Sequence, residues 1–310
     1  MLNSNNYIGK IREMLEKTGW AQAQFAQELG VTFATVNRWL NGHHRPHLSQ
    51  IRQIERLHKN IIGIIPVTKQ EIGRIILQLE AKRKQYPDIK KILRDDKTSE
   101  EFLLELTYNS DAIEGNTLTK KETETIIFNN ASIKDKSLVE HLEAVNHAVI
   151  LKDIFSGKIG CPVDEELIKK THKILMQGIR NDAGEYASHQ RAIRGVDLIL
   201  PSPDDIAGEI KLFLSKVNNF QRQPIEHIAR MHADFEAIHP FGDGNGRVGR
   251  LIMIVQLIHY GFAPCIITVN EKAGYYEFLE YAQKKSETHL VHFLAEAVLK
   301  GYELIGKRYK

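Results

Sequence analysis

The chain has 310 residues, of which 42% are hydrophobic and 26% charged, proportions typical of a folded protein with one large domain or two smaller ones. Two cysteines, Cys161 and Cys265, are too few for a disulfide framework and favour a reducing compartment. The first residues lack the basic and then apolar order of a secretion signal, and the apolar stretch Leu251–Gly261 is too short to cross a bilayer. The sequence therefore predicts a cytoplasmic protein with no membrane partner.

The formal net charge of +3 is unevenly distributed. Residues 1–66 contain eight Lys or Arg and four Glu, which gives +4, and the rest of the chain carries −1. The positive excess therefore belongs to the N-terminal segment, and its electrostatic attraction for nucleic acid is modest.

The segment Trp20–Pro46 has the pattern of two short helices joined by a glycine turn. Gly30 can end the first helix and Thr32 can cap the second. Val36 and Trp39 then face inward, and the outward positions hold residue types that can pair with base edges or phosphates: Thr35, Asn37 and Arg38. Residues 7–58 resemble the phage-repressor-like (Xre-type) helix-turn-helix family, which implies binding to DNA. A small helical packing module that does not contact DNA is the alternative.

The stretch Asn60–Lys69 contains Gly63 and Pro66 and predicts a junction between two domains. We expect a helix-turn-helix domain in residues 1–65 and a second domain in residues 66–310. Apolar residues recur every three or four positions on both sides of the junction, so the predicted fold class is mainly α.

One segment of the second domain, Gly184–Pro203, departs from the helical period. Its apolar residues cluster around a central glycine, which is typical of two short strands joined by a turn. The sequence therefore predicts a small β-hairpin here.

The region with the most chemical information runs from Met231 to Arg250. An apolar residue at every third or fourth position predicts a helix that ends near His239, because Pro240 follows. A second helix is predicted to begin after Asn245. Four glycines fall within eight residues between and just inside these helices: Gly242, Gly244, Gly246 and Gly249. Such glycines let successive amides turn toward one point at a helix N-terminus, which favours an anion.

The polar residues of this loop suit a bound triphosphate. Arg247 and Arg250 lie three positions apart, on one face of the helix, where they oppose the helix dipole unless a polyanion lies beside them. Asp243 is a hard oxygen ligand for Mg²⁺. His239 can accept a proton from an attacking hydroxyl, and Asn245 can donate to a phosphoryl oxygen and hold the shape of the loop.

Other motifs fit this loop less well. The glycine spacing matches a dinucleotide fingerprint, but a helix and not a strand precedes it. A calcium loop would place Arg247 at a ligand position, where its charge repels the ion. His232, Glu236 and His239 share a helical face, as in some zinc sites, but a hydrogen-bonded face is the commoner outcome.

Residues His239 to Arg250 resemble the motif of the Fic family, HPFx(D/E)GNGRxxR, at every fixed position. The resemblance implies a Fic-type helical domain over residues 66–310, with an N-terminal helical part (66–155) and a catalytic core (156–310). It further implies that ATP and Mg²⁺ bind at the loop. His239 would be the base, Asp243 the metal ligand, and Arg247 and Arg250 would contact the β- and γ-phosphates. The amides around Gly244 and Gly246, with Asn245, would hold the α-phosphate, and Gly242 would also belong to the ATP site.

A second segment, Ser110 to Asn116, resembles the inhibitory motif of this family, (S/T)xxxE(G/N). Ser110 and Glu114 lie one helical turn apart. The resemblance implies that Glu114 binds Arg250 in place of the γ-phosphate, so that ATP binds only unproductively.

The position of the predicted hairpin resembles that of the family's flap, which clamps a target segment by strand addition. The flap residues would be Ile193, Arg194, Gly195, Val196 and Asp197. Relatives often have Arg after the Tyr of this region, whereas Ala187 follows Tyr186 here. Three residues after the loop helix, Asn270, Tyr275 and Tyr276, are candidates for an adenine pocket or for the core.

The predicted function is an autoinhibited enzyme that transfers AMP from ATP to a hydroxyl of a protein target or of itself, with a DNA-binding N-terminal domain. One alternative is a DNA-binding regulator whose second domain senses nucleotide. Another is a Fic enzyme that transfers phosphate or removes AMP. Relatives often self-associate, and no feature of this sequence decides whether the chain does.

Overall fold

A computed structural model describes residues 7–62, 67–193, 198–219, 223–284 and 286–308. Within these residues every regular element is a helix, so the predicted mainly α class is confirmed. None of these helices is both long and apolar enough to span a bilayer.

The chain divides into two compact units, Met1–Pro66 and Val67–Lys310, each with its own apolar core. Helices of the first unit are α1 (Tyr7–Thr18), α2 (Gln22–Glu28), α3 (Phe33–Leu40) and α4 (Leu48–Ile62). Helices of the second unit are α5 (Lys69–Gln85), α6 (Ile89–Ile92), α7 (Asp96–Glu114), α8 (Lys120–Asn129), α9 (Leu138–Ser156), α10 (Glu165–Leu175), α11 (Ile206–Val217), α12 (Pro224–Ile238), α13 (Asn245–His259), α14 (Lys272–Lys284) and α15 (Thr288–Arg308), with short 3-10 turns at Pro203–Asp205 and Val269–Glu271.

In the N-terminal unit, α2 and α3 form a helix-turn-helix around the buried ring of Trp39. Gly30 adopts the left-handed conformation at the end of α2, with φ 65°. The hydroxyl of Thr32 accepts a hydrogen bond from the amide of Thr35 at 3.2 Å and caps α3. The turn and the cap predicted from the sequence are both present.

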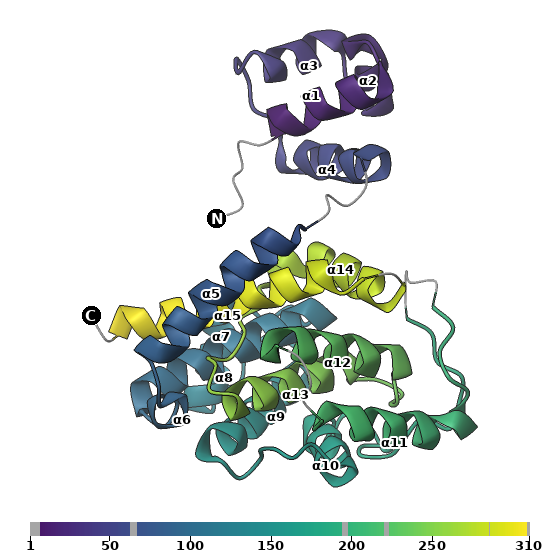
Figure 1. The fold of residues 1–310 in the computed structure, drawn as a ribbon. Coiled ribbons are helices and arrows are strands. Elements are labelled where there is room, and N and C mark those ends of the chain that lie inside the picture. Colours follow the sequence, from purple (N-terminus) through teal and green to yellow (C-terminus); the bar gives the residue numbers. More distant parts are fainter. Residues whose placement is uncertain (1–6, 63–66, 194–197, 220–222, 285, 309–310) are drawn as a thin grey trace. The chain divides into compact units, whose positions relative to one another are not determined.

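Helix α13 lies at the centre of the second unit, packed against α7, α10 and α12 (Figure 1). Residues 247–258 of this helix are all buried, which its nearly continuous apolar sequence requires. Since α7 and α12 reach α13 from different parts of the chain, polar residues at their ends can meet at its N-terminal turn.

Helix α7 carries the predicted inhibitory motif. The carboxylate of Asp95 caps its first turn by accepting from the amide of Thr98 at 3.0 Å. Gly115, with φ 110°, ends it in the left-handed conformation that favours glycine. The helix therefore presents Glu114 in its final turn.

The predicted β-hairpin is wrong for the residues that the structure describes: residues 184–193 and 198–203 contain no strand. Arg194, Gly195, Val196 and Asp197 lie outside the described residues, and Ile193 lies in irregular backbone. The segment instead forms a hydrogen bond to the loop that follows α12, where the predicted catalytic motif lies. The amide of Ala187 donates to the carbonyl of Pro240 at 2.9 Å, so this backbone group pairs with a loop and not with a partner strand.

Candidate functional site

The motif loop joins α12 to α13 through residues 239–244. His239 closes α12 in the left-handed conformation, with φ 50°, and its amide donates to the carbonyl of Phe235 at 3.0 Å. Gly244, with φ 78°, immediately precedes the first residue of α13. The first amides of α13 have no partners within the helix and can bind an anion.

Asn245 holds this loop closed. Its side-chain amide donates to the carbonyl of Phe241 at 2.8 Å, and its side-chain oxygen accepts from the amide of Phe241 at 2.9 Å. The side chain is buried, so these two bonds are shielded from water. The role in loop shape predicted for Asn245 therefore has a geometric basis.

Two of the motif glycines have side chains from other parts of the chain close to their Cα atoms. A Cβ at Gly246 would overlap with Oε1 of Glu114, and one at Gly244 would lie 3.0 Å from Sδ of Met176. Glycine at 246 thus lets the Glu114 carboxylate lie against the first turn of α13. In this structure Glu114 is the anion at the helix N-terminus.

Arg250 binds Glu114 and Ser110 together. Its Nη2 donates to Oε1 of Glu114 at 2.8 Å and to the carbonyl of Ser110 at 3.0 Å, and its Nε donates to the Ser110 hydroxyl at 3.1 Å. The Arg250 side chain is only 5% exposed, whereas that of Glu114 is 28% exposed. The contact predicted from the inhibitory motif is therefore present, with the carboxylate on the solvent side.

The pair stays charged. Burial raises the pKa of Glu114, but the charge of Arg250 and its hydrogen bond outweigh this, so that the pKa is lowered from its usual value. The phenol of Tyr276 also donates to Oε2 of Glu114, at 3.4 Å. Glu114 is thus an ionised carboxylate held over the loop.

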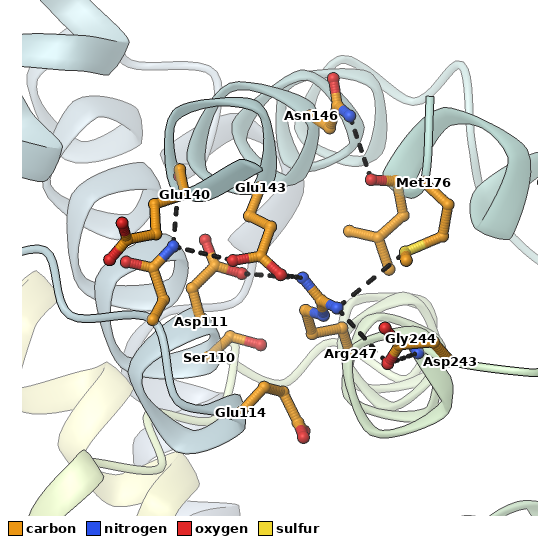
Figure 2. Close-up of polar contacts among 12 residues, drawn as sticks. Ser110, Asp111, Glu114, Glu140, Glu143, Asn146, Met176, Asp243, Gly244 and Arg247 are labelled. Atoms are coloured by element: carbon orange, nitrogen blue, oxygen red, sulfur yellow. Dashed lines mark hydrogen bonds and ion pairs between the residues drawn. The ribbon is translucent and has the colours of Figure 1, made fainter. Parts of the chain in front are cut away.

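Arg247 is held differently, by acids of two other helices. Its Nη1 donates to Oε1 of Glu143 on α9 at 2.7 Å and lies 3.9 Å from Oδ1 of Asp111 on α7. Its Nη2 lies 3.9 Å from Oδ1 of Asp243, on the loop itself. Figure 2 shows the guanidinium between these carboxylates. With 2% of its side chain exposed, Arg247 is a buried, paired cation, and its predicted contact with a phosphate stays a prediction.

Asp111 is the most unusual member of this group. It is buried, and neither carboxylate oxygen has a hydrogen-bond partner among the described residues. Burial raises the pKa of Asp111 to about 7, and the Arg247 charge opposes the rise. Four acids therefore lie around the two arginines, and one of them, Asp111, is about half protonated at pH 7.

Glu143 connects Arg247 to the end of α7, the helix with the predicted inhibitory motif. Its second oxygen, Oε2, accepts from Nδ2 of Asn116 at 2.9 Å, and the same Nδ2 donates to the carbonyl of Glu140 at 3.2 Å. One carboxylate thus contacts both the segment after α7 and the motif helix α13.

The His239 ring is oriented by its own helix. Its Nδ1 lies 3.3 Å from the carbonyl of Glu236, which can only accept, so Nδ1 carries the hydrogen and Nε2 has the free lone pair. Burial lowers the pKa of His239, and the hydrogen bond to the Glu236 carbonyl opposes this. A neutral imidazole with a free Nε2 can accept a proton near pH 7.

Asp243 presents a carboxylate to solvent beside the loop, with 57% of its side chain exposed. One oxygen accepts from the Gly244 amide at 2.6 Å. Within the described part of the chain no three His, Cys, Asp or Glu side chains converge as a metal cage. Mg²⁺ usually binds through one or two carboxylates together with substrate phosphates, and a single accessible carboxylate at a phosphate-type loop fits that chemistry.

Besides Asp111 and Glu143, two further residues that support the loop were not predicted from the sequence. Nδ1 of His172 accepts from the amide of Gly184 at 2.9 Å, and its Nε2 donates to the carbonyl of Asp243 at 3.1 Å. Arg191 donates to the carbonyls of Ile238 and His239 at 3.2 and 3.0 Å. Both come from segments far from the loop in sequence, and no local motif marks them.

The adenine candidates lie in different surroundings. Tyr275 is fully buried and stacks on His232 and Phe293, so its ring belongs to the core. Tyr276 is half-buried beside Glu114, and Asn270 is exposed. Contact of any of them with a nucleotide base stays a prediction.

In the N-terminal unit, Arg38 is exposed, and Thr35 and Asn37 are partly exposed on α3. Nδ2 of Asn37 donates to Gln22 at 3.4 Å, and Oδ1 of Asn37 accepts from Asn41 at 3.1 Å. These residues share one helix, and their contact with DNA stays a prediction.

The glycine loop between two packed helices, within an all-helical unit, defines a Fic-type fold. Residues 162–257 match the Fic/DOC family and residues 11–59 match a helix-turn-helix family. The second unit is therefore similar to the Fic/DOC family, and the first unit is similar to helix-turn-helix domains.

Curated relatives include proteins named protein adenylyltransferase Fic. That of Nematostella vectensis is 34% identical over 196 residues, which are 61% of this chain and 45% of the relative. That of Drosophila melanogaster is 30% identical over 203 residues, 64% and 41% of the two chains. The chain thus spans less than half the length of these relatives.

Solved structures have the same fold. A Fic domain-containing signaling protein from Bacteroides thetaiotaomicron aligns with a TM-score of 0.66 and 25% identity, over 75% of this chain and 97% of that one. Fic-1 from C. elegans aligns with a TM-score of 0.67 over 91% of this chain and 83% of that one, and its identity of 22% supports the fold alone.

Proposed function

We propose that this chain is a protein adenylyltransferase that transfers AMP from ATP to a hydroxyl side chain of a protein target, including itself. The observation that carries the proposal is the juxtaposition of a neutral His239, with Nε2 free, and an anion-binding loop at the N-terminus of α13. The names of the curated relatives support the same reaction.

In this reaction the hydroxyl oxygen of the target forms a bond to the α-phosphorus, and the bond from that phosphorus to the bridging oxygen of the β-phosphate breaks. His239 Nε2 takes the hydroxyl proton, and pyrophosphate leaves. The amides at the start of α13 would bind the transferred phosphate, and Asn245 keeps them in position. Mg²⁺ held at Asp243 would neutralise charge on the phosphates.

The enzyme as described would be autoinhibited. Glu114 takes the space above Gly246 and the hydrogen bonds of Arg250, both of which a triphosphate needs. Because two anions cannot share this guanidinium at low cost, ATP would bind in a shifted pose or displace Glu114. We expect Glu114 to move away from Arg250 first, after which ATP binds in the productive pose.

The N-terminal unit would bind DNA through α3. Its net charge of +4, the exposed Arg38 and the match to the helix-turn-helix family support this role. The unit would therefore direct the enzyme to DNA or control its own gene. We place the reaction in the cytoplasm.

Labelled ATP tests the reaction type. We expect Glu114→Gly to incorporate label from ATP carrying ³²P at the α-position and none from ATP carrying it at the γ-position, in the presence of Mg²⁺. Glu114→Gly combined with His239→Ala should lose the incorporation, because the second change removes the proposed base. Label from the γ-position would instead establish phosphotransfer, and the absence of both labels would contradict the proposal.

A further inference from the structure

The Nδ1 side of the His239 ring faces a second acidic group that the reaction above does not use. Oε2 of Glu236, one turn earlier on α12, lies 3.9 Å from Nδ1 of His239. Only 6% of the Glu236 side chain is exposed. A carboxyl group is therefore buried on the side of the imidazole opposite Nε2.

The other oxygen of Glu236 points at the motif helix. Oε1 has no hydrogen-bond partner within the described residues, and a Cβ at Gly249 would overlap with it. The same Cβ would lie 3.2 Å from Nδ1 of His232, which is also without a partner there. Two buried, unpartnered polar atoms from α12 thus converge on one glycine of α13, and glycine at this position gives the carboxyl its room.

His232 is itself fixed from α14. Its Nε2 lies 2.6 Å from the phenol oxygen of Tyr275, and the two rings stack with centroids 5.9 Å apart. The ring of Tyr275 is fully buried. A row of buried polar side chains therefore leads from Tyr275 through His232 and Glu236 to His239.

The charge on Glu236 depends on its neighbours. Facing it are His232 on α12, His239 directly after that helix, Arg250 on α13, Glu114 on α7, and the phenols of Tyr275 and Tyr276 on α14. Burial raises the pKa of Glu236 to about 8, with Arg250 lowering it and Glu114 raising it. Burial lowers the pKa of His232 to about 3, so this ring is neutral and adds no charge.

We propose that Glu236 is a positioning residue for His239: its carboxyl group orients the imidazole from the Nδ1 side and, once ionised, stabilises the imidazolium that forms during transfer. This inference rests on the proposed adenylyl transfer. The hydroxyl proton goes to Nε2 of His239 and later to solvent, and Glu236 itself neither gains nor loses a proton in the step. A carboxylate about 4 Å from an imidazolium favours the protonated ring.

The consequence is a rate that depends on the charge of Glu236. Where Glu236 is neutral, Glu and Gln at this position should support similar rates. As pH rises through the pKa of Glu236, the carboxylate appears and the rate of the natural side chain should rise. A side chain that only fills space gives no such pH-dependent difference.

The test compares Glu114→Gly with Glu114→Gly/Glu236→Gln, measuring kcat and KM for ATP from pH 6 to pH 9. Removing Glu114 takes away a charge that raises the pKa of Glu236. In the Glu114→Gly protein, the rise in kcat that accompanies ionisation of Glu236 should therefore occur below pH 8. We expect the Gln variant to lack this rise, with the kcat ratio growing from about twofold at pH 6 to about tenfold at pH 9. KM for ATP should change by less than about twofold, because Glu236 is not among the residues proposed to bind the phosphates. Glu226→Gln, on the same helix, is the matched control.

The titration of the His239 ring can be measured without turnover. The ¹⁵N shifts of the His239 ring in Glu114→Gly should show two inflections with pH, and Glu236→Gln should remove the upper one. Parallel kcat profiles with a constant ratio, or an unchanged His239 titration, would overturn the positioning role alone. A Glu114→Gly reference that transfers no AMP would overturn the proposed function and this inference with it.

Discussion

Arg247 and Arg250 lie one helical turn apart, yet the protein holds their guanidinium groups in different ways. Arg250 pairs with Glu114, whose side chain is 28% exposed, whereas Arg247 pairs with Glu143, whose side chain is 16% exposed. Breaking a buried ion pair costs about 3–5 kcal/mol when one partner is left alone, so the partner nearer to solvent is the easier one to replace. Of the two, Arg250 is therefore better placed to exchange its carboxylate for a phosphate.

The buried Asp111 should make the free energy of unfolding depend on pH. Its pKa is raised from 3.8 to about 7 in the folded state, so the folded chain keeps a proton that the unfolded chain releases between these values. The contribution of this group to stability is present below about pH 4 and is lost as pH rises to about 7. Asp111→Asn removes that loss, and its stability relative to wild type should rise by about 2–4 kcal/mol between pH 4 and pH 8.

Urea unfolding of both proteins at several pH values measures this difference. Glu100→Gln, an exposed change on the same helix, should show no such trend with pH. A difference between Asp111→Asn and wild type that stays constant from pH 4 to pH 8 would contradict a neutralised, buried Asp111.

The residues of the site fall into two groups by how far the sequence predicts them. Motif spacing predicted His239, Asn245 and Arg250, because all three lie within one continuous stretch of sequence. Glu143 and His172 could not be found this way, since each meets the loop only through the packing of a distant helix. For Tyr275 the sequence left core and pocket open, and the structure buries its ring.

At the scale of elements, the end of α7 is tied to α9 as well as to α13. Asn116 donates to Oε2 of Glu143 and to the carbonyl of Glu140, and its own Oδ1 accepts from the amide of Leu118 at 2.9 Å. These bonds fix the backbone immediately after Glu114. They therefore help to keep the Glu114 carboxylate over the loop.

Asn116→Ala should weaken autoinhibition while leaving Glu114 in place. Loss of a hydrogen bond to a charged group costs about 1.5–3 kcal/mol, part of which local relaxation recovers, so we expect self-modification about three- to tenfold above wild type and below Glu114→Gly. Incorporation of label from ATP carrying ³²P at the α-position measures the rate of self-modification.

Thr125→Ala is the control, because it removes only a hydrogen bond inside the neighbouring helix α8. Equal labelling of wild type and Asn116→Ala would mean that the end of α7 is held by Arg250 alone.

Helix prediction succeeded where propensity and burial agree, as in α12 and α13, whose apolar residues face the core at helical spacing. The hairpin prediction rested on apolar residues around Gly195 without any identified partner strand. In the structure the described part of that segment bonds to the motif loop, through Ala187 and Arg191. Such long-range pairing has no local signal in the sequence.

At the scale of the molecule, two separate apolar cores correspond to two family matches. The domain boundary between Pro66 and Val67 lies in the stretch with Gly63 and Pro66 that the sequence marked as a junction. Charge follows the same division, with the excess of +4 in residues 1–66. The proposed partners follow the same division, with DNA proposed for the first unit and a nucleotide for the second.

Binding of duplex DNA by the N-terminal unit can be tested in the full chain. The full chain should bind duplex DNA from upstream of its own gene more tightly than a mixed-sequence duplex, with affinity falling as salt rises. Arg38→Ala should lower the affinity for the specific duplex about tenfold or more, since a base contact by Arg contributes about 1–3 kcal/mol. Fluorescence anisotropy measures both. Equal binding by Arg38→Ala and wild type would contradict a recognition role for α3.

The most direct test of the account is the intact mass of the Glu114→Gly protein after incubation with ATP and Mg²⁺. The account predicts a gain of one or more AMP groups in this variant and little or none in wild type, because only the variant frees Arg250 and the space above Gly246. Equal masses for the two proteins after the same treatment would contradict it.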